Sequence, residues 1–265
     1  MQIKELLNYL ELSVPLKYQE HYDNSGMICG DENTELSGVL ICIDSVEGHI
    51  DEALKKNCNL IIAHHPLIFG EVKKITTGDY IGRTLMKAIR NNIAIYAMHT
   101  NLDNMLHNGV SEKIALKLGL LEISLLSSKT GSNSDELPIG SGVTGQLPIP
   151  MDEKEFLHFL KNTLNTNCIR HTRLLGKAIQ KVAICGGSGV FLLKNAIQAN
   201  ADVYVSADFK YHDFFDADGK ILVADTGHYE SEQFTVEIIY DIITKRFSNF
   251  AAHLTELNSN PINYL

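Results

Sequence analysis

The sequence predicts an α/β fold of two domains with mainly parallel or mixed sheets. Two observations predict it. Short apolar runs lack the polar alternation of half-exposed strands, as is typical of strands covered on both faces. Stretches with helical apolar spacing lie between these runs, and this alternation indicates βαβ units. A length of 265 residues fits one large domain or two small ones.

The first half begins with a helical apolar pattern over residues 2–11, followed by a turn-rich segment at 21–26. Strands and helices are then expected to alternate: strand 39–43, helix 48–57, strand 60–63, helix 80–91 and strand 93–98. In open α/β sheets, ligands bind beyond the carboxyl ends of the strands. The residues that follow each predicted strand are therefore the first candidates for a functional site.

The second half has the same α/β character without repeating the sequence. The polar segment 127–136 is expected to be a linker or an exposed loop. After it we expect a strand from Gly140 to Leu147, a helix from Asp152, strands at 182–185, 203–205 and 221–224, and a long helix from Tyr229 to Phe247. We place the first domain at 1–126, completed by the C-terminal helical segment 228–265, and the second domain at 137–227.

Composition and charge narrow the functional classes. The formal net charge of −9 disfavours long-range attraction to nucleic acid or to an anionic membrane. No apolar run approaches the roughly 20 residues that span a bilayer, and the first residues carry no apolar signal region. A cytoplasmic protein is therefore expected. Five scattered cysteines without a CxxC pair indicate neither a disulfide framework nor a zinc–thiolate site.

Histidines and carboxylates gather where three predicted strands end. His64 and His65 follow the first strand, and their side chains should leave an extended backbone in different directions. The second strand is followed by His99 to Asp103, and the third by the segment from Asp225 to Glu232. An ordinary pair of capping histidines, or an exposed i,i+4 pair on a helix, would explain each segment alone. Together they predict a metal site with His and carboxylate ligands.

For other polar residues the sequence leaves more than one role open. Asp208 and His212 follow the strand at 203–205 and are interpreted as partners of a metal ligand or as a proton shuttle, with a solvated helix start as the alternative. His99 is equally consistent with orienting Asp103 and with capping a strand. The Gly186–Gly189 segment fits a tight turn better than a phosphate-binding loop. Asp44 follows a strand end, but the sequence assigns it no role.

These motifs resemble the signatures of the NIF-three-like dinuclear metal-centre family, whose bacterial members are labelled GTP cyclohydrolase 1 type 2 homologs. The resemblance covers essentially the whole chain. Tyr22 departs from it, since Trp is usual there, and the polar linker replaces the inserted domain of longer members. The motifs that carry the resemblance are Ala63–Pro66, His99–Asp103 and Gly227–Glu232, with matching segments at Asp23–Gly26 and Gly186–Gly189.

The resemblance implies two divalent metal ions, in a cleft between two α/β domains, and a ring-shaped homohexamer. Carried over to this sequence, the implied ligands are His64, His65, Asp103, His228 and Glu232. Nitrogen and oxygen ligands without thiolate suit Zn²⁺, Fe²⁺ or Mn²⁺ and do not single out one of them.

The predicted function is that of a metal-dependent hydrolase. The family label implies a nucleotide substrate, GTP, whose ring is opened by metal-activated water, with His212 expected to transfer protons. Two alternatives stay open. A phosphoesterase would use the same kind of dinuclear site. A non-catalytic, metal-stabilised ring would instead bind or regulate a partner.

Overall fold

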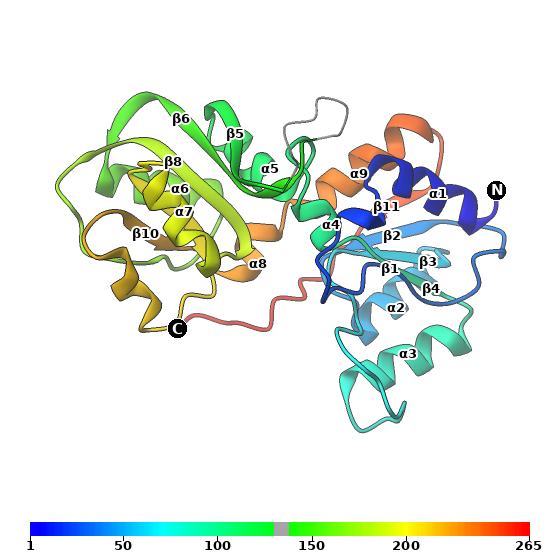
Figure 1. Ribbon diagram of the computed structural model, residues 1–265. Coiled ribbons are helices and arrows are strands. Elements are labelled where there is room, and N and C mark those ends of the chain that lie inside the picture. Colours follow the sequence, from blue (N-terminus) through cyan, green and yellow to red (C-terminus); the bar gives the residue numbers. More distant parts are fainter. Residues whose placement is uncertain (130–137) are drawn as a thin grey trace. The chain divides into compact units, whose positions relative to one another are not determined.

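The computed structural model describes residues 1–129 and 138–265. The chain divides into two compact units. Unit 1 comprises Met1–Leu102 and Thr235–Pro261, and unit 2 comprises Asp103–Phe234 and Ile262–Leu265. Each unit contains one mixed sheet covered by helices, which confirms the predicted α/β class (Figure 1).

Unit 1 is built on a five-stranded sheet with the strand order β1-β4-β3-β2-β11. Its strands are β1 (Gly26–Cys29), β2 (Val39–Cys42), β3 (Leu60–Ala63), β4 (Ala94–Ala97) and β11 (Ala252–Leu254). β11, β2, β3 and β4 run parallel, and β1 is antiparallel to β4. Cys42 pairs with Ala63, which pairs with Ala97, so β2, β3 and β4 end at the same level. The segments that follow them therefore emerge at one edge of the sheet.

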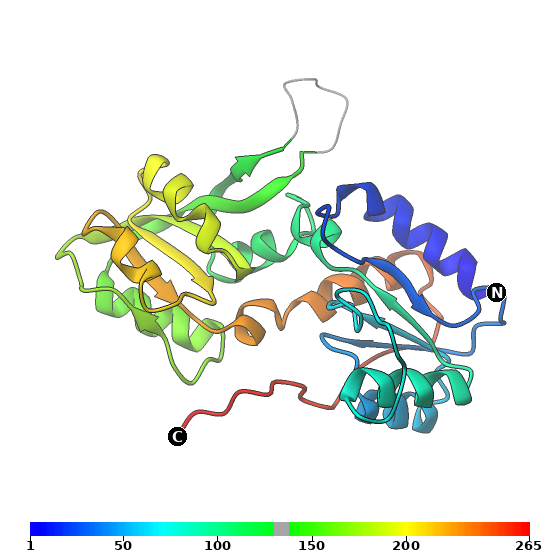
Figure 2. The ribbon, with the colours of Figure 1, turned by 60° about the horizontal axis from the view of Figure 1, so that its bottom comes forward.

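Helices cover both faces of this sheet because its central strands are apolar on both sides. α2 (Glu47–Lys55) and α3 (Tyr80–Arg90) lie side by side on one face, as Figures 1 and 2 show. Their residues Ile50 and Leu85 pack in a cluster with β-strand side chains such as Ile61. α1 (Ile3–Ser13) and α9 (Thr235–Arg246) cover the other face. There the Tyr96 hydroxyl donates to Glu11 Oε1 of α1 at 3.0 Å.

Unit 2 is built on a six-stranded sheet with the strand order β5-β6-β8-β9-β10-β7. β8, β9 and β10 run parallel, and the other pairings are antiparallel. The strands are β5 (Leu121–Ser128), β6 (Gly140–Asp152), β7 (Arg170–His171), β8 (Ala178–Ser188), β9 (Val203–Ala207) and β10 (Leu222–Asp225). The parallel trio again brings three carboxyl ends together at one edge.

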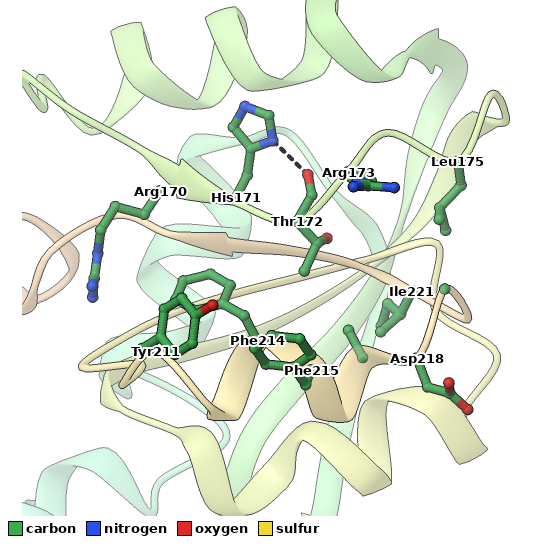
Figure 3. Close-up of a pocket in the computed structure, with 12 residues that line it drawn as sticks. Arg170, His171, Thr172, Arg173, Leu175, Tyr211, Phe214, Phe215, Asp218 and Ile221 are labelled. Atoms are coloured by element: carbon green, nitrogen blue, oxygen red, sulfur yellow. Dashed lines mark hydrogen bonds between the residues drawn. The ribbon is translucent and has the colours of Figure 1, made fainter.

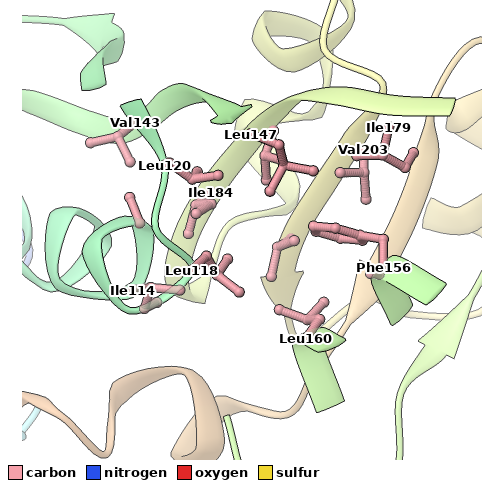
Figure 4. Packing of buried hydrophobic residues seen from close by; sticks show 14 of the residues in the cluster. Ile114, Leu118, Leu120, Val143, Leu147, Phe156, Leu160, Ile179, Ile184 and Val203 are labelled. Carbon is pink, nitrogen blue, oxygen red and sulfur yellow. The ribbon is translucent and has the colours of Figure 1, made fainter. Parts of the chain in front are cut away.

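The unit 2 sheet also has a packed layer on each face. α5 (Val110–Lys117) and α6 (Glu153–Thr163) cover one face, where Phe156 and Leu160 of α6 pack with strand residues such as Val203 (Figure 4). α7 (Leu193–Gln198) and the short helix η3 (Asp213–Ala217) cover the other face. Burial of these side chains from both faces holds the parallel strands in place.

Several helices end on a residue with left-handed backbone geometry, which is a common helix stop. Asn57 follows α2, Asn92 follows α3 and Asn165 follows α6, with φ between +48° and +56°. Asn is among the few non-glycine residues that adopt this geometry readily. The sequence therefore encodes where these helices end.

The structure differs from the sequence expectations at three places. The long helix expected from Tyr229 to Phe247 is two helices, α8 (His228–Glu232) and α9, and the break falls where the chain passes from unit 2 to unit 1. At the break, the Gln233 side chain donates to the carbonyls of Leu164 and Glu230.

Residues 103–126, placed by sequence in the first domain, pack in unit 2, because β5 pairs with β6 and α5 joins the unit 2 core. Of the expected linker, residues 127 and 128 belong to β5, and 130–136 lie outside the described residues.

Within residues 1–129 and 138–265, no helix has both the length and the apolar character needed to cross a membrane.

Glu153 provides a test of how unit 2 is held together. This buried carboxylate accepts hydrogen bonds from the backbone amides of Leu175 at 2.7 Å and Gly176 at 2.8 Å. Removal of this carboxylate leaves two backbone N–H groups without their acceptor.

We expect Glu153→Ala to lower the free energy of unfolding by about 2 kcal/mol, measured by urea denaturation followed by circular dichroism. Glu155→Ala, on an exposed position of the same helix, should stay within about 0.5 kcal/mol of the parent. Equal losses in both variants would contradict this role.

Candidate metal centre

The carboxyl edge of the unit 1 sheet carries three histidines. His64 and His65 follow β3, and His99 follows β4, the neighbouring parallel strand. One ring nitrogen from each of the three lies within 4.8 Å of the others. The ring of His99 is 5.3 Å from that of His64 and 5.4 Å from that of His65, measured between centroids. Adjacent strand ends thus create a cluster of imidazoles that could bind a metal ion.

Hydrogen bonds determine which nitrogen each ring of this cluster can offer. Nδ1 of His64 lies 2.8 Å from the Met98 carbonyl oxygen, which can only accept, so Nδ1 carries the proton. Nδ1 of His65 donates to Asp44 Oδ1 at 2.7 Å, and Asp44 follows β2. In a neutral imidazole with a protonated Nδ1, the lone pair for a metal is on Nε2. Asp44, to which the sequence assigned no role, therefore orients a predicted ligand.

His99 is held in the same way, by Asp23. Its Nδ1 lies 2.7 Å from Asp23 Oδ1, and the amide and hydroxyl of Thr100 donate to the other carboxylate oxygen. Burial acts to raise the pKa of Asp23, but the hydrogen bonds from His99, Thr100 and Ser25 hold it well below its usual range. Asp23 is therefore ionised in folded unit 1 and can accept the Nδ1–H of His99. The sequence left open whether His99 orients Asp103 or caps a strand, and the structure places it in the imidazole cluster with its Nδ1 bonded to Asp23.

In unit 2, the candidate ligands follow β10. His228 and Glu232 are one turn apart on α8, and His228 Nε2 lies 3.0 Å from Glu232 Oε2. His228 Nδ1 donates to Asp208 Oδ2 at 2.7 Å, and Asp208 follows β9. Burial acts to lower the pKa of His228, but the two carboxylates raise it to about 11. The protonated ring therefore lies between two anions. A metal cation could replace the proton on Nε2, beside Glu232.

Glu232 is 2% exposed and is confined by the backbone around it. A Cβ at Gly187, where φ is +65°, would lie 2.0 Å from Glu232 Oε1, so only glycine fits beside this carboxylate. Carboxyl oxygens of Asp103 and Glu232 lie within 4.8 Å of each other. Burial, together with the charges of Asp103 and Glu232, raises the pKa of the Cys185 thiol to about 12. Two carboxylates this close favour a cation between them.

Two further sequence expectations concern this region. The Gly186–Gly189 segment is mostly the end of β8, and its role here is the close approach of Gly187 to Glu232. His212 is exposed, and its ring lies 5.1 Å from that of Tyr211 and 6.2 Å from that of Phe215, between centroids. In the described part of the chain, the residue hydrogen-bonded to His228 Nδ1 is Asp208. The catalytic role of His212 remains a prediction.

The residues fit a divalent metal. The donors are imidazole nitrogens and carboxylate oxygens, which suit Zn²⁺, Fe²⁺ and Mn²⁺. In proteins, metal-binding histidines almost always donate their second ring N–H to a carboxylate or a carbonyl. His64, His65 and His228, all predicted ligands, each have such a partner at Nδ1.

Known proteins are similar to this chain in sequence and in fold. A curated relative from Clostridium acetobutylicum, described as "GTP cyclohydrolase 1 type 2 homolog", is 31% identical over 233 residues, which cover 88% of this chain and 85% of the relative. One from Staphylococcus epidermidis with the same description is 27% identical over an alignment of 368 residues that covers both chains fully. That alignment is longer than this chain, so the relative has segments with no counterpart here.

A solved structure extends the similarity to three dimensions. The crystal structure of a Staphylococcus aureus hypothetical protein matches with a TM-score of 0.91 and 29% sequence identity, covering 100% of this chain and 99% of that one. A sequence profile of the family described as Duf34/NIF3 (NGG1p interacting factor 3) matches residues 1–261. The chain therefore belongs to the Duf34/NIF3 family.

Proposed function

We propose that this protein is a divalent-metal-dependent hydrolase that acts on a nucleotide. Its proposed ligands are His64, His65, Asp103, His228 and Glu232, shared between two metal ions. The substrate class is suggested by relatives described as GTP cyclohydrolase 1 type 2 homologs. Assembly into a hexameric ring is part of the same proposal, from the resemblance alone.

One observation carries the proposal: every proposed histidine ligand has its Nδ1 fixed by an oxygen acceptor. His64 is held by the Met98 carbonyl, His65 by Asp44 and His228 by Asp208, all at 2.7–2.8 Å. The exposed His107 and His171 also have an oxygen acceptor at Nδ1, but the proposed ligands have it at the ends of neighbouring strands. The repeated arrangement supports ligand function, because it fixes both the tautomer and the ring orientation before a metal binds.

The residues of the chain then have separable tasks. Asp44 and Asp208 accept the Nδ1–H of His65 and His228. These hydrogen bonds make the other ring nitrogen, Nε2, a more basic metal ligand. Asp103 and Glu232 supply negative charge that offsets the charge of the cations. When bound, divalent metals in such sites lower the pKa of water and polarise the bond to be cleaved. Gly187 leaves room for Glu232, whose carboxylate would otherwise meet a side chain.

The direct test is turnover of nucleotides by protein loaded with Zn²⁺, Fe²⁺ or Mn²⁺. Loss of purine absorbance would report ring opening of GTP, and phosphate release would report phosphoester cleavage. We expect metal-dependent turnover that is lost together with metal in His65→Ala and Glu232→Ala. His158→Ala, an exposed histidine of unit 2, is the matched control and should keep both. Metal-loaded protein with no turnover of any nucleotide or phosphoester would contradict a hydrolase and favour a non-catalytic ring.

The same assay tests His212. If His212 transfers protons, His212→Ala should keep its metal and lose about 10²–10⁴-fold in turnover, the usual contribution of a general acid or base. Unchanged turnover would remove His212 from the mechanism and leave the carboxylates as the candidates.

The protonation of His228 gives a second test, on metal-free protein. Because its folded-state pKa of about 11 lies above the ordinary value of 6.5, its contribution to stability is full below pH 6.5 and is lost as the pH rises toward 11. Binding of a metal near neutral pH must displace this proton, so affinity should rise with pH. NMR of the imidazole C–H groups after chelation should show His228 charged at pH 8, and Glu232→Gln should lower its pKa. A neutral His228 at pH 8 in the parent would contradict this electrostatic account.

A further inference from the structure

A pocket of about 850 Å³ lies in unit 2. Figure 3 shows its two walls: His171, Thr172 and Arg173 on one side, and Tyr211, Phe214 and Phe215, from η3 and the segment before it, on the other. Its volume lies within the range of small-molecule sites, which is roughly 300–1,000 Å³. None of the proposed metal ligands lines it, and the ring of His212 lies beside its wall residues Tyr211 and Phe215.

The lining of this pocket is basic in a protein that is acidic. Its charged residues are Arg170, Arg173 and Asp218. Asp218 is paired with Lys220 at 2.8 Å, and Arg170 donates to Asp225 and to the Phe209 carbonyl. Among residues 1–129 and 138–265, Arg173 forms no hydrogen bond or ion pair. Arg173 is therefore positioned to bind an anion, for which a guanidinium is well suited.

The opposite wall exposes aromatic rings to solvent. Tyr211 is 72% exposed and Phe215 is 64% exposed. Their ring centroids are 5.4 Å apart, with an angle of 68° between the planes, so together they form a corner. Phe214 is partly buried against the unit 2 core, and its ring is 5.5 Å from Arg170 Cζ. Solvent-exposed aromatic rings that face a wall containing an arginine indicate a ligand with a planar ring and a negative charge.

The walls are fixed by the fold before any ligand binds. Thr172 extends the edge of the sheet: its amide donates to the Val223 carbonyl at 3.1 Å, and its hydroxyl accepts from the Val223 amide at 3.0 Å. Glu153 holds the backbone of the lining residue Leu175. Ala217 of η3 is buried in the core. A preformed site loses less conformational entropy on binding.

We propose that this pocket binds a planar aromatic anion, with its ring against Tyr211 and Phe215 and its phosphate or carboxylate at Arg173. A nucleoside monophosphate and a simple aryl carboxylate share this chemistry. The proposal does not depend on the metal centre, because all the groups that carry it belong to the pocket.

Calorimetric titration of the full-length protein, as purified and after chelation, tests the proposal. The probes are guanosine 5′-monophosphate, phenyl phosphate and benzoate, with guanosine and inorganic phosphate as halves of the first. We expect at least one aromatic anion to bind both to the protein as purified and to the chelated protein. It should bind about tenfold or more tighter than guanosine and than inorganic phosphate. The tighter of phenyl phosphate and benzoate identifies the anion that the pocket prefers.

Matched variants assign the binding to this pocket. Arg173→Ala should weaken it about tenfold or more, the value of a charged hydrogen bond. Tyr211→Ala should weaken it about tenfold through loss of stacking. Lys177→Ala, an exposed cation outside the pocket, and Phe191→Ala, an aromatic that is 65% exposed elsewhere in unit 2, should bind as the parent does. Absence of binding by every aromatic anion, equal losses in Arg173→Ala and Lys177→Ala, or binding that disappears on chelation would overturn the proposal.

Discussion

The Nδ1 hydrogen bonds at the strand ends determine what the histidines of this protein can do. In unit 1, a carbonyl and two carboxylates hold His64, His65 and His99, and in unit 2 a carboxylate holds His228. Met98, Asp44 and Asp208 follow the ends of strands that neighbour the histidine's own strand, and Asp23 precedes β1, which pairs antiparallel with β4. The parallel strands must therefore end at the same level for these pairs to form, and apolar packing on both faces of each sheet keeps them there.

Buried carboxylates supply the second constraint. Glu232 is enclosed beside Gly187, and Asp103 lies close to it in the same unit. Ionised groups in such surroundings need a compensating positive charge. Protonated His228 supplies part of it without metal, because the carboxylates of Glu232 and Asp208 raise the pKa of that ring. The same electrostatics that set the resting protonation state of His228 would favour a bound cation.

Much of the fold could be predicted from the sequence because it rests on local patterns. The strand at residues 60–63 lies where the apolar run placed it, and the strand-end positions of His64, His65 and His228 follow from the same pattern. The partners could not be predicted, since Asp23 and His99 are 76 residues apart and no local pattern joins them. The break between α8 and α9 could not be predicted, because the sequence from Tyr229 to Phe247 contains no Gly or Pro to mark it. The aromatic and basic walls of the pocket likewise meet only after folding.

Anomalous X-ray diffraction from metal-loaded crystals, recorded at the absorption edge of the bound metal, tests the central claim most directly. The account predicts two anomalous peaks per chain, with Nε2 of His64, His65 and His228 as ligands at about 2.0–2.1 Å if the metal is zinc. Metal bound through Nδ1 of these rings, or no peak beside them in crystals that contain the metal elsewhere, would contradict it.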